Sequence, residues 1–309
     1  MTILILSVIV LSIVLVIAGY TYRTAFYAPK SKRSSIDDPL EGPQYEVFQE
    51  HISRISHIME RIPCEPVTIT SFDGCKLYGR YYHVNDDAPL EILFHGYRSC
   101  AFRDCSGGHA LSRKMGFNAL VVDQRAHGKS GGHTISFGLK ERYDVLSWVN
   151  YANRRFGTDT KILLYGLSMG SATVIMASGL NLPKNVVGIV ADCPYSSPVD
   201  IIKKVIKDMR LPPMVLYPFV FLGALIFGRL NLEETTCEKE VKKSRTPILI
   251  FHGEDDRFVP DEMSKIIYEA NKDMVTRESF KDAGHGLSFI KDPLRYKKAL
   301  IEFWEKVLK

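Results

Sequence analysis

Residues 161–179, KILLYGLSMGSATVIMASG, decide the fold of this chain. The apolar run Lys161–Tyr165 leads into the pentapeptide Gly166-Leu167-Ser168-Met169-Gly170, and a helix-length stretch follows at once. A nucleophile on so tight a strand-to-helix turn needs small residues two positions to either side, because the backbone folds back on itself. Glycine fills both positions, so the pattern predicts a nucleophile elbow that raises the Ser168 hydroxyl above the edge of a sheet.

The Met169 N–H lies at the amino terminus of the helix that follows this elbow, where negative charge is favoured. We therefore expect it to donate to the oxyanion that forms when Ser168 attacks a carbonyl group. The simpler alternative is that Ser168 only caps the helix. The flanking Gly166 and Gly170 favour the elbow.

The rest of the chain alternates similar apolar runs with helix-length stretches. The runs are Leu90–Phe94, Ala119–Val122, Val186–Ala191 and Pro247–Phe251, and stretches such as Lys140–Phe156 and Met169–Gly179 lie between several of them. Such a pattern predicts an α/β fold with a mostly parallel central sheet and helices on both faces. Chemistry is expected in the loops at the carboxyl ends of the strands.

The length of 309 residues suits one large α/β domain with insertions. We assign that domain to residues 67–309. Residues 23–66 precede it as a linker and an amphipathic helix, with a polar linker over 23–38 and an apolar stripe from Tyr45 to Met59 that is expected to pack on the main domain.

One segment, residues 193–243, is too long for a simple connection between strands and is predicted to be a helical cap. Its first helix should begin near Pro198. Residues 211–230 are strongly apolar but contain three prolines and two glycines, which favours a hydrophobic lid over a second membrane span.

The first 22 residues are suited to a different environment. Between Thr2 and Tyr22 there is no charge, and Ile3–Ile17 consists of isoleucine, leucine and valine apart from two serines. As a helix this stretch would cross the roughly 30 Å hydrocarbon core of a bilayer. We predict a single-pass transmembrane anchor over 1–22. A cleaved signal peptide or a buried core helix is the alternative, and the lack of a basic residue before Arg23 argues against the signal peptide.

Basic residues follow this apolar segment at Arg23, Lys30, Lys32 and Arg33, so the positive-inside bias predicts a cytoplasmic catalytic domain. The net charge is +5, and outside residues 23–33 the lysines and arginines are scattered without a long basic run. We therefore expect no nucleic-acid partner. Six scattered cysteines indicate free thiols in a reducing compartment, and none has the spacing of a zinc site, so no metal is expected.

A serine hydroxyl is a poor nucleophile until a base removes its proton. Among nine histidines, His285 lies between two glycines just before the predicted last helix, Asp292–Leu308. Partners of a serine on such an elbow follow in the order nucleophile, acid, base, so His285 is our candidate base. His95, His127 and His252 also lie at strand ends or turns, and we expect them to be structural.

The acid should lie between Ser168 and His285. Three adjacent carboxylates, Glu254, Asp255 and Asp256, follow the run that ends at Phe251. One of them should orient the imidazole, and the residues alone do not choose among them. A fourth candidate, Asp192, is interpreted as a structural carboxylate.

A second oxyanion donor is expected in the turn His95-Gly96-Tyr97, directly after the apolar run Leu90–Phe94. Gly96 lets the backbone come close to a substrate oxygen, so we choose the Tyr97 N–H. The alternative is that this segment is only a tight turn.

Taken in order, these motifs closely resemble the α/β-hydrolase superfamily, and most of all its serine aminopeptidase-like and monoacylglycerol-lipase-like branch. The resemblance covers about residues 67–309 and rests on His95-Gly96, Asp123–Ser130, Gly166–Gly170, His252–Pro260 and Gly284-His285.

This resemblance implies that Asp256, four positions after the histidine of the pair His252-Gly253, is the acid of the triad, and it agrees with the Tyr97 N–H as an oxyanion donor. Arg125-Ala126-His127-Gly128 departs from the Arg-Gly-x-Gly that the family commonly shows, at a structural turn. The segment 193–240 matches the family's cap only in position, so the choice of substrate stays open.

We therefore expect a serine hydrolase that cleaves carboxylic esters through an acyl-enzyme, with Ser168 attacking, His285 as base and then acid, and Asp256 holding the imidazole. No cofactor is implied. The apolar lid and the anchor favour a hydrophobic, lipid-like acyl ester. A thioesterase or a serine peptidase would use the same residues, and a non-catalytic, membrane-attached binding module is the alternative of another class.

Overall fold

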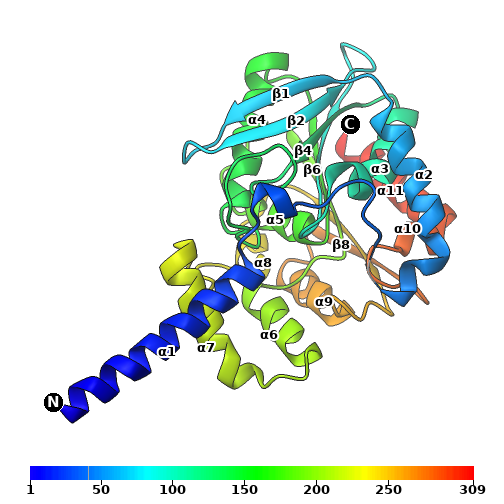
Figure 1. The fold of residues 1–309 in the computed structure, drawn as a ribbon. Helices are drawn as coiled ribbons and strands as arrows, with labels where there is room; N and C mark the ends of the chain where they lie inside the picture. Colours follow the sequence, from blue (N-terminus) through cyan, green and yellow to red (C-terminus); the bar gives the residue numbers. More distant parts are fainter. Residues whose placement is uncertain (41) are drawn as a thin grey trace.

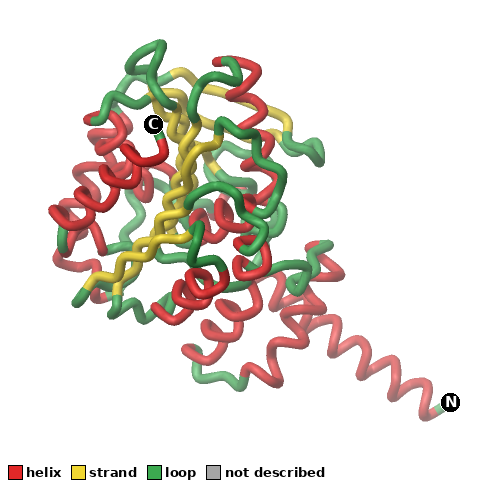
Figure 2. Tube along the Cα trace, turned by 180° about the vertical axis from the view of Figure 1, so that it is seen from behind, coloured by secondary structure: helices red, strands yellow, loops and turns green. Residues whose placement is uncertain are grey.

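A sheet of eight strands runs through the protein, and helices cover both of its faces (Figures 1 and 2). The computed structural model describes residues 1–40 and 42–309. The strand order is β1-β2-β4-β3-β5-β6-β7-β8; β2 is antiparallel to both of its neighbours, and all other pairs are parallel. The predicted α/β fold with a mostly parallel sheet is confirmed.

The strands are β1 Glu65–Thr70, β2 Lys76–Tyr82, β3 Leu90–Phe94, β4 Asn118–Asp123, β5 Ile162–Leu167, β6 Val186–Asp192, β7 Ile248–Gly253 and β8 Val275–Phe280. β3, β4 and β7 are buried along their whole length, as expected of strands covered on both sides. The apolar pattern did not predict β8, a strand at the edge of the sheet whose central side chains are partly or fully exposed.

Helices α2 Gln49–Glu60, α3 Ala101–Lys114, α10 Ser288–Lys291 and α11 Pro293–Val307 cover one face of the sheet. The other face is covered by α4 Glu141–Phe156, α5 Met169–Ser178, α8 Cys237–Val241 and α9 Asp261–Ala270. The remaining helical segments are α1 Thr2–Ala25, η1 Lys30–Lys32, η2 Pro43–Phe48, α6 Pro198–Asp208, α7 Pro213–Gly223 and the π-helical η3 Ala224–Gly228.

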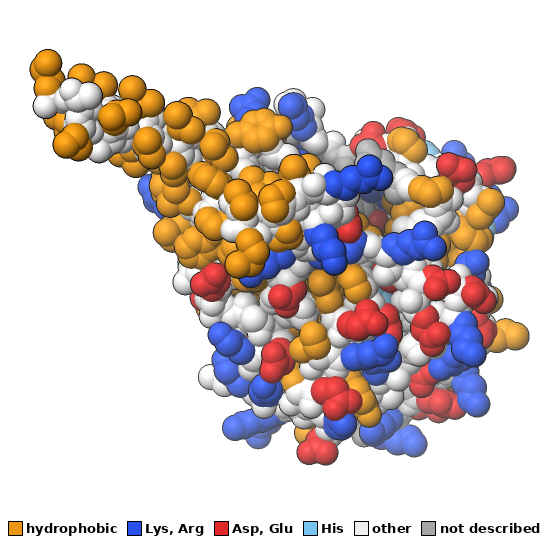
Figure 3. Space-filling model, turned by 90° about the horizontal axis from the view of Figure 1, so that it is seen from below, with side chains coloured by type: hydrophobic (Ala, Val, Ile, Leu, Met, Phe, Trp, Pro, Cys, Tyr) orange, Lys and Arg blue, Asp and Glu red, His pale blue; other side chains and the backbone are white. Residues whose placement is uncertain are grey.

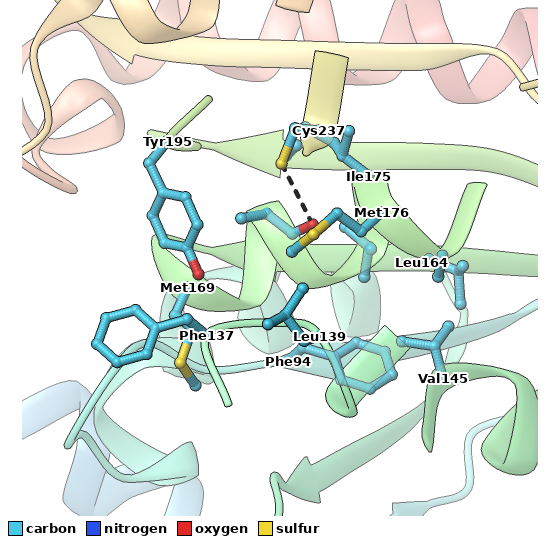
Figure 4. Packing of buried hydrophobic residues seen from close by; sticks show 14 of the residues in the cluster. Phe94, Phe137, Leu139, Val145, Leu164, Met169, Ile175, Met176, Tyr195 and Cys237 are labelled. Atoms are coloured by element: carbon cyan, nitrogen blue, oxygen red, sulfur yellow. Dashed lines mark hydrogen bonds between the residues drawn. The ribbon is translucent and has the colours of Figure 1, made fainter. Parts of the chain in front are cut away.

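Helix α5, which follows the elbow, is buried along its whole length. Met169 and Met176 pack among Phe94 and Phe137, and the Cys237 thiol donates to the carbonyl oxygen of Ala172 at 3.6 Å (Figure 4). A helix enclosed on all sides by apolar groups has little freedom to shift. The residue at its amino terminus is therefore held at a defined position relative to the sheet.

The elbow depends on two close backbone approaches. Ser168 has φ +55° and ψ −116°, a strained conformation for a residue with a side chain. A Cβ atom on Gly166 would lie 2.3 Å from the carbonyl oxygen of Gly170, and one on Gly170 would lie 2.1 Å from that of Phe94. Both glycines are therefore required for steric reasons, as predicted. Ser168 makes no side-chain capping bond, so the helix-cap interpretation is wrong.

The segment 23–38 is not a free polar linker, contrary to the sequence-based expectation. Helix α1 continues to Ala25, and Phe26 is fully buried in the main core. The Arg33 guanidinium donates to four carbonyl oxygens between His127 and Gly132. The amphipathic helix α2 packs on α3 of the main domain, as expected.

Helix α1 is long and apolar enough to cross a membrane. Its most apolar stretch of 18 residues has a mean hydropathy of 3.0, and 6% of that stretch is buried. A signal sequence has the same properties, so length and composition do not separate the two. The apolar cap segment Pro213–Gly228 is shorter than a membrane span, in agreement with the expectation of no second crossing. Helix α6 begins at Pro198, as predicted.

Replacing Gly170 by alanine should destabilise the fold by about 2–3 kcal/mol, because the new methyl group meets backbone that no rotamer change can move away. Gly107 in α3 is the matched control, since a Cβ there meets nothing within 4 Å. Gly107→Ala should be neutral or stabilise by up to about 1 kcal/mol. Denaturant unfolding in detergent measures both changes, and equal effects would contradict the steric account of the elbow.

Candidate active site

Ser168, His285 and Asp256 form a continuous hydrogen-bonded chain at the carboxyl edge of the sheet. The Ser168 hydroxyl donates to His285 Nε2 at 2.9 Å, and His285 Nδ1 donates to Asp256 Oδ2 at 2.6 Å. Ser168 follows β5, Asp256 follows β7 and His285 follows β8. The three side chains are 8%, 9% and 5% exposed, so they interact out of bulk water. The structure thus brings His285 into contact with Ser168, 117 positions earlier in the chain, and with Asp256, 29 positions earlier.

The Asp256 carboxylate is held by donors on both oxygens. Its Oδ1 accepts from the backbone N–H groups of Phe258 and Val259 at 2.9 and 2.7 Å, and its Oδ2 faces His285 and His252. Burial alone would raise the pKa of Asp256, but the two imidazoles outweigh it and hold that pKa well below its ordinary value. The carboxylate therefore stays ionised next to His285.

His285 responds to the same pairing in the opposite direction. Burial disfavours its imidazolium form, but the charge and hydrogen bond of Asp256, together with the more distant Asp192 and Asp104, outweigh burial and raise the pKa of His285 above its ordinary value. Tyr45, from the segment before α2, donates its hydroxyl to the His285 carbonyl oxygen at 2.9 Å. The Asp256 carboxylate thus orients the ring of His285, and the Tyr45 phenol holds the main chain of the same residue.

The other two acidic neighbours of Asp256 are placed differently. The side chains of Glu254 and Asp255 are exposed, and Ser279 donates to Glu254 at 2.9 Å. Asp192 is buried at the end of β6 and accepts from the Tyr296 hydroxyl at 3.0 Å, and burial raises the pKa of Asp192 to about 6. Of the four candidate acids, Asp256 alone bonds the imidazole.

The predicted oxyanion donors flank Ser168. Within residues 1–40 and 42–309, the N–H groups of Tyr97 and Met169 make no hydrogen bond to a protein acceptor. Between β3 and α3, the Gly96 N–H donates to Asp104 Oδ2 at 2.7 Å, which fixes the turn that carries Tyr97. A Cβ on Gly96 would lie 3.4 Å from the Ser168 Cβ, so this turn passes directly beside the serine.

Three further histidines at strand ends have structural partners. His95 Nδ1 donates to the Gly96 carbonyl, and its Nε2 accepts from the Gln124 N–H at 3.0 Å. His127 bridges the Arg125 carbonyl and the Arg98 N–H. His252 donates to the Val259 carbonyl at 2.9 Å. These bonds account for His95 and His127 as structural residues, as expected from the sequence. His252 differs, because its Nε2 also faces Asp256 Oδ2 at 3.4 Å and its buried Nδ1 has no hydrogen-bond partner among the described residues.

Cys193 is a neighbour that sequence reasoning missed. Its sulfur lies 3.8 Å from His285 Nε2, and one ligand atom from each of Cys193, Asp256 and His285 lies within 4.8 Å of the others. Such a cluster could hold a soft metal ion only if the Cys193 thiol lost its proton and became a thiolate. Burial raises the pKa of Cys193 well above its ordinary value, and His285 is already paired with Asp256 and Ser168, so the donor set suits a metal poorly.

A cavity of about 810 Å³ opens onto Ser168 and His285. Its walls come from the segment 32–55, from α3 and from the carboxyl-terminal region, with apolar side chains such as Leu40, Ile52 and Leu111. Among the described residues that line it, none belongs to the cap, 193–243. The expectation that the cap forms the lid of the site is therefore wrong. The segment before the domain covers the site instead.

Known proteins resemble this chain in sequence and in fold. Residues 92–225 match the family model described as "alpha/beta hydrolase fold". The chain is 26% identical to YqkD of Bacillus subtilis over 249 residues, which is 79% of this chain and 81% of YqkD. It is 29% identical to human ABHD12B over 194 residues, 60% of this chain, and that match spans about half of ABHD12B.

Among solved structures, the Pyrococcus furiosus esterase Pf2001 superimposes with a TM-score of 0.66 at 24% identity, covering 90% of this chain and 98% of the esterase. A second structure of the same esterase gives a TM-score of 0.64 at 26% identity, with 79% and 90% coverage. The sheet order, the family match and these neighbours agree. The chain has the α/β-hydrolase fold.

Proposed function

We propose that this protein is a serine hydrolase that cleaves carboxylic esters through an acyl-enzyme intermediate. The observation that carries the proposal is the hydrogen-bonded chain from Ser168 through His285 to Asp256, at 2.9 and 2.6 Å. The similarity to an archaeal esterase of the same fold supports the reaction class. No metal or organic cofactor takes part in the proposed mechanism.

In this mechanism, His285 takes the Ser168 proton as the hydroxyl attacks the ester carbonyl, and then gives it to the leaving alcohol. Asp256 stabilises the imidazolium while it exists. The N–H groups of Tyr97 and Met169 are proposed to receive the oxyanion, because two preorganised donors at that point stabilise the developing charge. Water, activated by the same imidazole, then releases the acid.

The apolar side chains along the cavity favour a hydrophobic acyl group over a highly charged one. Thioesters and peptides can react by the same route, so thioesterase and serine peptidase activities are alternatives within the class. A screen of p-nitrophenyl esters of graded chain length, with thioester and aminoacyl amide controls, separates them. We expect the esters to be turned over fastest.

A non-catalytic binding module attached to a membrane is the alternative of another class, since folds can outlast their chemistry. The ordered hydrogen bonds at Ser168 argue against it, because a module without catalysis has no need of an aligned base. A fluorophosphonate probe distinguishes the two functions. The folded protein should be labelled at Ser168, and a folded protein that fails to react would support the binding module.

Ser168→Ala should lower ester turnover by about 10³-fold or more, because the nucleophile is lost while the remaining groups persist. The variant should stay folded, since Ser168 makes no capping bond that alanine would break. Turnover of p-nitrophenyl butyrate, with circular dichroism as the control for folding, measures the effect. Retained turnover at a tenth of the wild-type rate or more would refute the assignment of the nucleophile.

Asp256→Asn should lower kcat by about 10⁴-fold, because an amide can neither stabilise the imidazolium nor hold the productive tautomer. Asp255→Asn is the matched control. It should change kcat less than about twofold, because Asp255 is exposed and the carboxylate that bonds His285 is that of Asp256. Equal losses in the two variants would leave Asp256 without its proposed role.

The pH dependence of kcat/KM should report the pKa of His285. The base must be neutral to accept the Ser168 proton, so kcat/KM should rise with pH through an apparent pKa above 6.5. In Asp256→Asn the attraction that raises this pKa is gone, so the acid limb of the residual activity should move to lower pH. A shift to higher pH, or none, would contradict the proposed coupling.

A further inference from the structure

Large apolar side chains are exposed along the cap between residues 209 and 227. They are Met209, Leu211, Met214, Val215, Leu225, Ile226 and Phe227, with exposures from 42% to 85%. We call this set the cap face. A contiguous exposed apolar surface on a protein marks an interaction site. The partner has to be identified from what surrounds the cap face.

The cap face is continuous with helix α1. Gly223 of α7 packs so closely on α1 that a Cβ there would lie 2.3 Å from the Ala18 carbonyl oxygen. The Thr21 hydroxyl lies within hydrogen-bond distance of the Phe219 carbonyl oxygen at 3.1 Å, and the Tyr22 and Phe227 rings are 5.9 Å apart. Figure 3 shows the apolar surface of α1 passing without interruption onto this part of the body. The two surfaces therefore face the same environment.

The arrangement of the two helices agrees with a bilayer. In Figure 1, α7 runs across α1 close to the body instead of along it. The apolar stretch Ile3–Ile17 is about 22 Å long at helical rise, and its side chains are exposed except for the partly buried Val14 and Ile17. A helix lying in the membrane plane inserts its apolar face by about 5–10 Å. An apolar helix of this length beside an inserted cap face is of the same order as a hydrocarbon core of roughly 30 Å.

Exposed basic residues border the cap face. Arg210 directly precedes Leu211, Arg229 follows Phe227 after one residue, Lys207 lies one turn earlier on α6, and Arg23 lies on the last turns of α1. Cations at this level attract the anionic headgroups of phospholipids. Of the exposed acidic residues nearby, Asp208 is paired with Lys204 and Glu233 accepts from the Tyr217 hydroxyl, so the unpaired charges named here are positive. The charge pattern therefore favours a lipid surface as the partner.

We propose that the cap face inserts into one leaflet of an anionic phospholipid bilayer, with α7 and η3 lying in the membrane plane and α1 crossing it. The cap is then a membrane-docking element and not a lid over Ser168, in agreement with its absence from the described walls of the cavity. The body is held at the bilayer at two points, α1 and the cap face.

The test places a tryptophan on the cap face of the full chain in vesicles of phosphatidylcholine and phosphatidylglycerol. Both native tryptophans, Trp148 and Trp304, are buried, so the wild-type protein supplies the background. Met214→Trp should be quenched at least threefold more than the control by lipids brominated near the headgroup. Leu294→Trp is that control, because Leu294 is 80% exposed on α11, away from the cap. Val215→Trp repeats the measurement if Met214→Trp does not fold.

Quenching of the cap tryptophan by brominated lipid, with protection from aqueous acrylamide, supports the proposal. Equal quenching of the cap and control tryptophans by acrylamide overturns it. Protection from acrylamide without quenching by brominated lipid also overturns it, because the cap face is then covered by protein, such as a second copy of this chain.

A second inference rests on different contacts, those between the end of α1 and the turn that carries Tyr97. The Tyr97 hydroxyl donates to the Ala25 carbonyl at 2.7 Å, and the Arg98 guanidinium donates to the carbonyls of Thr24 and Tyr27 at 3.0 Å each. Carbonyls in the last turn of a helix lack partners within the helix. The membrane-proximal end of α1 is therefore completed by side chains of the proposed oxyanion turn.

Arg98 also holds this turn from the other side. It has φ +48°, a strained conformation for an arginine, and its N–H donates to His127 Nε2 at 3.0 Å. We infer that Arg98 is a positioning residue that sets the Tyr97 N–H toward the oxyanion. This inference rests on the proposed function, and it couples the end of α1 to the site.

Arg98→Ala should lower kcat by about 10–100-fold with little change in KM, because a displaced donor affects the transition state most. Affinity for a trifluoromethyl ketone, which binds as an oxyanion, should fall in parallel, and Arg98→Lys should restore part of both.

Arg155→Ala is the control, since Arg155 pairs with Glu65 at the far edge of the sheet. An unchanged kcat in Arg98→Ala overturns the inference, as does a lower kcat with unchanged affinity for the ketone. Activity retained in Ser168→Ala would instead refute the proposed function.

Discussion

The close approach of two backbones at the elbow is the constraint on which the site depends. Gly166 and Gly170 lie where any Cβ would strike a carbonyl oxygen, so β5 can turn into α5 within a single residue. That residue is Ser168, in a strained conformation that the packed helix behind it maintains. Core packing therefore holds the hydroxyl in place, and the position of the proposed nucleophile is a consequence of apolar burial.

Electrostatics then distinguishes the groups around the serine. Burial alone would push Asp256 toward its neutral form and His285 away from its charged form. Their contact, with His252 as a second imidazole beside Asp256, reverses both tendencies, because opposite charges attract strongly where water is excluded. An ionised carboxylate beside a basic imidazole is the arrangement that activates a hydroxyl. The exposed carboxylates of Glu254 and Asp255 gain no such partner.

The surroundings of the site come from outside the sheet. The segment 32–55 walls the cavity, and Tyr45 from that segment bonds the backbone of His285. The cap packs on α1 and on the main core, exposes other apolar side chains, and contributes no residue to the described walls of the cavity. The two segments thus have different roles, and the difference follows from which of them contacts the carboxyl edge of the sheet.

Local pattern was enough to identify the parallel strands, the elbow and the serine, because these follow from periodicity and from the size of glycine. The apolar pattern did not predict the edge strand β8, because its partly or fully exposed central residues form no apolar run. The burial of Phe26 and the route of segment 23–38 also went unforeseen, because one aromatic residue in a polar stretch says little about what it packs on.

From the sequence alone came the α/β fold, the candidate nucleophile and base, and a set of three adjacent carboxylates that only a family resemblance narrowed to Asp256. Tertiary structure decided which carboxylate bonds the imidazole, which segment covers the cavity and what the cap contacts. The physical reason is that strands and tight turns are specified by neighbouring residues, whereas hydrogen bonds across 29 or 117 positions and the walls of a cavity exist only once the chain has folded.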